Sequence, residues 1–72
     1  MNAVEFLKKE LESYEDSFRK IALDFNNIVL ELITGCGMGE HEARIETEAV
    51  KRALKNRRDF LRELLSKAKE EE

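Results

Sequence analysis

The residues most able to do chemistry lie together in the glycine-rich stretch ITGCGMGEHEA, residues 33–43. This stretch holds all three glycines, the only cysteine and the only histidine of the chain. The sulfurs of Cys36 and Met38, with the imidazole of His41, form a ligand set suited to a soft metal such as Cu(I). The pattern is compatible with a soft-metal or redox sensor. We favour a simpler interpretation, a glycine-rich turn between two helices, because a zinc site would need further Cys or His ligands.

The rest of the sequence lacks the patterns that are typical of catalysis. No Gly-Lys-Ser/Thr follows the glycines, as a phosphate-binding loop would require. The segment HEARIE begins like the zinc motif H-E-x-x-H, but Ile45 occupies the position of the second histidine. No serine or cysteine has a general base nearby in the sequence. We therefore predict that the protein is not an enzyme and that it needs no cofactor.

Six basic residues of the second half recur at spacings that place them on one side of a helix. This basic stripe consists of Arg44, Lys51, Lys55, Arg58, Arg62 and Lys69. Such a stripe could follow a nucleic-acid backbone, with an affinity that falls as salt is added. The interpretation that we favour is that the stripe faces acidic side chains of the first half. The net charge of −3 also argues against a generally basic nucleic-acid-binding protein.

Apolar residues of the first half are separated alternately by three and four positions, the heptad spacing of a coiled-coil helix. This spacing predicts a helix over about residues 3–34, and the absence of proline favours a long one. Asn2 can cap its first turn. Gly35 stands where a residue with left-handed dihedral angles would end it.

The second half repeats the spacing in a weaker form, with a threonine and Arg57 on the apolar line. We expect a loop over about residues 35–39, a second helix over about 40–69, and an acidic tail at 70–72. The two lines fit one another in an antiparallel hairpin whose facing residue numbers add to 75. We call the line of residues that faces the other helix the seam.

This register predicts the hairpin core and several ion pairs. Arg57 would face Phe18, and its stem could pack on the ring while its head reaches water. Glu12 would lie near Arg62, and Glu31 would lie opposite Arg44. The predicted core residues are Leu7, Leu11, Tyr14, Phe18, Ile21, Phe25, Ile28, Leu32, Val50, Leu54, Leu61 and Leu64.

Further apolar residues lie off the seam, more than a two-helix hairpin can cover. The predicted association surface consists of Phe6, Ala22, Val29, Ile33, Ala49, Ala53 and Phe60. Two hairpins related by a twofold axis would cover it as a four-helix bundle. The sequence thus predicts a single all-α domain over residues 1–72, an antiparallel helical hairpin that forms a homodimer. A bundle with a different helical protein would cover the same surface.

These features favour a non-enzymatic interaction or regulatory protein that self-associates and presents helix faces to a macromolecular partner. The alternatives are a nucleic-acid-binding regulator that uses the basic stripe, and the metal or redox sensor described above. A single cysteine cannot form an internal disulfide, which is typical of a cytoplasmic protein. The N-terminus becomes acidic too early for a signal peptide, and no apolar run is long enough to cross a membrane.

Overall fold

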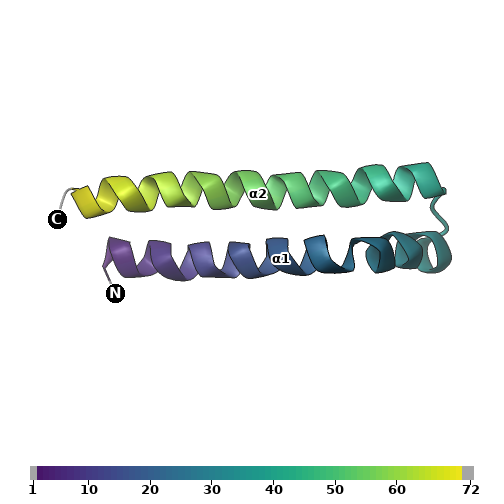
Figure 1. The fold of residues 1–72 in the computed structure, drawn as a ribbon, viewed down its shortest axis with the longest axis horizontal. Helices are drawn as coiled ribbons and strands as arrows, with labels where there is room; N and C mark the ends of the chain where they lie inside the picture. Colours follow the sequence, from purple (N-terminus) through teal and green to yellow (C-terminus); the bar gives the residue numbers. More distant parts are fainter. Residues whose placement is uncertain (1, 71–72) are drawn as a thin grey trace.

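The protein is a hairpin of two long helices. The computed structural model describes residues 2–70. In this range, α1 (Ala3–Cys36) and α2 (Glu40–Glu70) are joined by the short loop 37–39. The helices lie side by side and antiparallel, so that the start of α1 and the end of α2 lie at the end of the hairpin away from the loop (Figure 1). The predicted all-α antiparallel hairpin is confirmed.

The predicted acidic tail divides between α2 and the residues beyond it. Glu70 is the last residue of α2, which ends one position later than expected. Glu71 and Glu72, like Met1, lie outside the described residues. The hairpin is elongated, with its Cα atoms extending over 50 × 17 × 16 Å.

The ends of α1 are set by side-chain and glycine caps. The side chain of Asn2 accepts a hydrogen bond from the Glu5 amide at 2.9 Å, the cap that was expected. At the other end Gly37 has left-handed dihedral angles, with φ at 71°, and the Met38 amide donates to the Leu32 carbonyl at 3.2 Å. The assignment of this role to Gly35 is wrong, because Gly35 is still helical. The sequence alone does not distinguish two glycines so close together as the end of the helix. In the structure, the left-handed dihedral angles and the hydrogen bond at the turn identify Gly37 as the residue that ends it.

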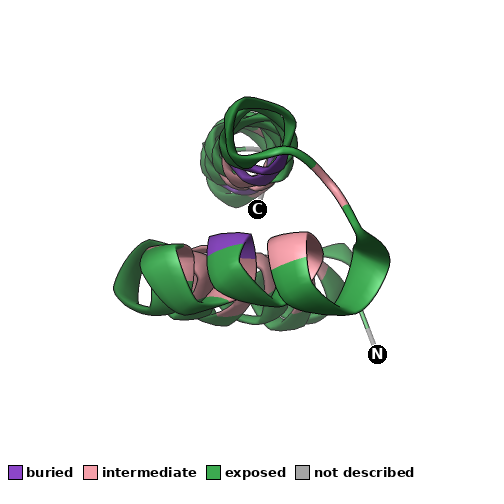
Figure 2. Cartoon of the chain, turned by 90° about the vertical axis from the view of Figure 1, so that its right-hand side faces the viewer, coloured by how far each residue is buried: buried purple, intermediate pink, exposed green. Residues whose placement is uncertain are grey.

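A kink interrupts α1 at Asp24, whose dihedral angles of −102° and 17° are not helical. Asp24, Asn26 and Asn27 are weak helix formers, because their side chains can bond to nearby backbone groups. Viewed along α2, α1 spreads sideways (Figure 2). Beyond the kink, Val29 faces α2 and is only 4% exposed. The prediction that Val29 lies on the association surface is therefore wrong, because Val29 is buried within the single hairpin.

The seam of α2 differs from the predicted one. Val50 is 49% exposed, and Lys51 next to it is partly buried. Leu65 is buried, whereas Leu64 is half-buried. Spacings of three and four are compatible with both the predicted and the observed line of residues. The observed line includes long basic side chains, whose methylene stems can pack while their charged groups remain in water. The seam of α2 consists of Ala43, Thr47, Lys51, Leu54, Arg58, Leu61, Leu65 and Ala68.

The resulting core is small. The buried apolar residues are Val4, Val29, Ala43, Leu61 and Leu65. The remaining predicted core residues of α1, from Leu7 to Leu32, are half-buried. None of the large side chains described is fully buried. One hairpin alone therefore shields little apolar surface from water.

Candidate functional site

Two aromatic rings of α1 lie against basic side chains of α2. The guanidinium of Arg58 lies 4.7 Å from the centre of the Phe18 ring. The ammonium of Lys51 lies 5.8 Å from the centre of the Phe25 ring. Both distances fit cation–π contacts. The numbers of the facing residues therefore add to 76 rather than to the expected 75. Phe18 meets Arg58 in place of Arg57, and Phe25 meets Lys51 in place of Val50.

Arg57 lies off the seam. Its side chain is exposed, and its guanidinium lies 5.6 Å from the Phe60 ring on the same helix. The prediction that Arg57 faces Phe18 is therefore wrong, because α2 turns Arg58 toward α1 instead. Arg57 is free to meet another molecule.

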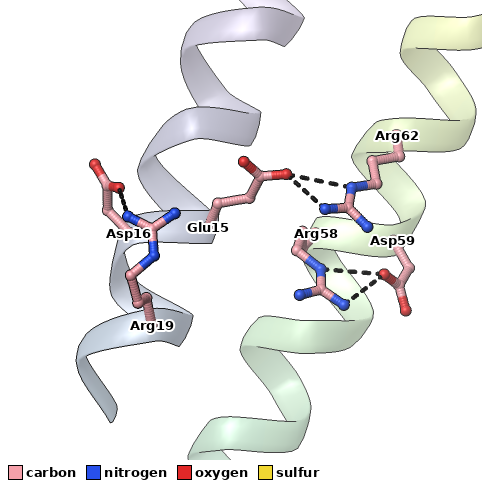
Figure 3. Close-up of polar contacts among 6 residues, drawn as sticks. All are labelled: Glu15, Asp16, Arg19, Arg58, Asp59 and Arg62. Atoms are coloured by element: carbon pink, nitrogen blue, oxygen red, sulfur yellow. Dashed lines mark hydrogen bonds and ion pairs between the residues drawn. The ribbon is translucent and has the colours of Figure 1, made fainter. Parts of the chain in front are cut away.

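One ion pair joins the helices directly. Nη2 and Nε of Arg62 donate to the same oxygen of Glu15 at 2.8 and 3.2 Å (Figure 3). Sequence reasoning assigned Glu12 to Arg62, but the shifted register brings Glu15 within reach. Arg44 contacts Glu40 at 3.4 Å within α2, and not Glu31 as expected. Such half-exposed pairs contribute about 0–1 kcal/mol each, so they help to choose the register more than they stabilise the fold.

The basic stripe is largely occupied within the chain. The Arg58 side chain is only 17% exposed and donates to Asp59 at 3.1 and 3.2 Å (Figure 3). Arg44, Lys51 and Arg62 have the partners described above, while Lys55 and Lys69 are exposed. Lys51, Arg58 and Arg62 contact α1, but among the described residues only Arg62 pairs with an acidic side chain of that helix, so the interpretation that the stripe faces the acids of α1 holds for this residue alone.

The three ligand candidates of the glycine-rich segment differ in how far they are buried. Cys36 and His41 are exposed. Met38 is half-buried and borders a pocket together with Ile28 and Leu32. Within residues 2–70, no three His, Cys, Asp or Glu side chains are grouped so that they could hold a metal ion. Methionine sulfur is not among these ligand types, so the soft-metal set of Cys36, Met38 and His41 stays a prediction.

An apolar groove lies between the helices in the half of the hairpin near the loop. Ile21, Ile28, Leu32, Met38, Glu46, Thr47 and Val50 line it. The Thr47 hydroxyl donates to the Ala43 carbonyl at 2.8 Å, so its hydrogen-bonding capacity is used within α2. Glu46 is the one charged residue of the lining. Sequence reasoning missed this groove because it placed Val50 in the core.

Large apolar side chains are exposed on both helices. Leu23 is 78% exposed, and the other five are about half exposed: Phe6, Leu30, Ile45, Val50 and Phe60. Of the remaining residues predicted to form the association surface, Ala22, Ala49 and Ala53 are exposed and Ile33 is half-buried. Where such residues form one contiguous patch, they are typical of a surface that binds another protein.

A comparison with protein-family models, with curated proteins and with solved structures found no match for this chain. Neither helix, over the residues described, combines the length and apolar character that crossing a membrane requires. Function must therefore be argued from the surfaces of the hairpin.

Proposed function

We propose that this protein is a non-enzymatic helical interaction protein that self-associates into a four-helix bundle and presents helix faces to a macromolecular partner. The observation that carries this proposal is the mismatch between core and surface. No large side chain within residues 2–70 is fully buried, while six large apolar residues are about half exposed or more. A chain of 72 residues gains little from so small a core, and a second hairpin would cover the exposed residues.

The face that remains after self-association is suited to a partner. Leu23 and Leu30 lie on either side of the kink in α1, and both are exposed. They do not line the apolar groove. A bundle closed over the groove would leave these two leucines available to a second protein. The lone exposed thiol of Cys36 supports a reducing, cytoplasmic setting.

Sedimentation equilibrium tests the self-association. We expect a mass twice the 8.4 kDa of one chain at micromolar concentration. A monomer throughout the accessible concentration range would overturn the proposal. For the outward face, a Leu23→Glu, Leu30→Glu variant should remain a dimer and should lose the proteins that the unaltered chain retains in affinity capture from its host.

A further inference from the structure

The apolar groove continues into a stripe on α2 that is complementary to itself. Glu46, Val50, Ala53 and Arg57 are separated by four, three and four positions, which places them along one side of the helix. All four are exposed, and two of them line the groove. Along the chain, this stripe consists of one acidic, two apolar and one basic residue, and it is distinct from the basic stripe described above. Laid antiparallel against a copy of itself, it brings each acid to a base and each apolar residue to another.

We infer that this stripe and the apolar groove form the contact with a second copy of the chain, in an antiparallel arrangement with two reciprocal ion pairs between Glu46 and Arg57. The inference rests on the self-association proposed above and names its surface and register. Val50 of each copy packs against Ala53 of the other. The loops of the two hairpins then lie at opposite ends of the bundle.

The groove wall contributed by α1 supports the same arrangement. Ile21 and Ile28 both line the groove. In an antiparallel dimer in which Ile21 of each copy contacts Ile28 of the other, the twofold axis passes midway between these positions. That point on α1 lies beside Phe25. The axis that pairs Glu46 with Arg57 passes beside Lys51. Because the Lys51 ammonium lies 5.8 Å from the centre of the Phe25 ring, the two positions face each other in the hairpin, and one axis serves both helices.

The charges of the stripe and the size of the hairpin face agree with a second copy of the chain as the partner. Glu46 and Arg57 are eleven positions apart, about 16 Å along α2, so they cannot pair within one chain. Neither has an ion-pair partner elsewhere in residues 2–70. One long face of a molecule that extends over 50 × 17 Å is large enough for the roughly 800 Å² that each partner of a stable dimer buries. The ion pairs would mainly fix orientation, and the apolar groove would supply affinity.

A charge exchange tests the interface directly. The unaltered protein and the variants Glu46→Arg, Arg57→Glu and Glu46→Arg/Arg57→Glu are compared by sedimentation equilibrium, with circular dichroism to confirm that each is helical. Each single variant places like charges together twice, so its dimer dissociation constant should rise by about tenfold or more. The double variant restores both pairs across the axis, and its dissociation constant should return to within about threefold of the original.

Glu48→Arg is the matched control. It makes the same change of charge on α2. Glu48 is exposed beside Lys51 and Lys55, and it is not one of the residues that form the proposed contact. Its dissociation constant should stay within about threefold of the original. A dimer that is indifferent to the single exchanges, or that the double exchange fails to restore, would overturn this interface while leaving self-association intact. A wild-type protein that stays monomeric would overturn both.

Discussion

Gly35 and Gly37 lie two positions apart but occupy different backbone conformations. Gly35 is within α1, and Gly37 has a φ of 71° that residues with a side chain rarely adopt. A Cβ atom at either position would meet nothing within 4 Å, so sterics outside the backbone do not distinguish them. The effect of a substitution therefore depends on backbone preference alone.

Replacing these glycines by alanine should change stability in opposite directions. Gly35→Ala should raise the free energy of unfolding by about 0.5–1 kcal/mol, because alanine loses less entropy in a helix. Gly37→Ala should lower it by about 1–2 kcal/mol, the cost of left-handed dihedral angles for a residue with a Cβ. Thermal unfolding at one protein concentration measures both, and each kcal/mol corresponds to about 4–8 °C. A stabilised Gly37→Ala would contradict the left-handed turn.

Single residues also show where sequence reasoning reaches its limit. Val50 and Lys51 are neighbours, and either continues a spacing of three and four from Thr47. Apolar character favoured Val50 for the core, but in the structure Val50 is 49% exposed and Lys51 is half-buried, with its ammonium 5.8 Å from the centre of the Phe25 ring. An aromatic ring attracts a cation, which favours Lys51 over Val50 at the position facing Phe25. A pattern that counts lysine only as polar cannot include this effect.

At the scale of the elements, the heptad spacing was sufficient to predict two helices, their antiparallel packing and their bounds to within two residues. It was not sufficient for the rotation of α2 about its axis. The cations over Phe18 and Phe25 and the pair between Glu15 and Arg62 are the contacts made in the observed rotation. The kink at Asp24 was also missed, although the weak helix formers around it were the available signal. The candidate groove depends on both features, so it could not be predicted.

A double-mutant cycle tests the rotation of α2. Phe18→Leu is combined with Arg58→Met and, separately, with Arg57→Met, and the free energy of unfolding is measured in urea. The coupling between Phe18 and Arg58 should be about 0.5–1 kcal/mol, because the guanidinium lies over the ring. The coupling between Phe18 and Arg57 should be near zero. The reverse result would restore the register that the sequence favoured.

At the scale of the whole molecule, the question is how much of the stability belongs to one hairpin. Leu61 is 3% exposed in the single chain, so its burial does not depend on a second copy. Val50 is half exposed and lines the apolar groove, so in our proposal the second copy completes its burial. The two residues therefore report separately on the hairpin and on the bundle.

Leu61→Ala and Val50→Ser should respond differently to protein concentration. Leu61→Ala should lower the free energy of unfolding by about 2–5 kcal/mol at every concentration, through loss of packing in the hairpin. For a dimer, a hundredfold increase in concentration stabilises the folded state by about 2.7 kcal/mol, and the melting temperature rises accordingly. Val50→Ser should weaken association, so its melting temperature should rise less than that of the unaltered protein over the concentration range where only the latter is dimeric. If neither protein's melting temperature changes with concentration, the hairpin is stable by itself and its exposed apolar residues serve a different partner.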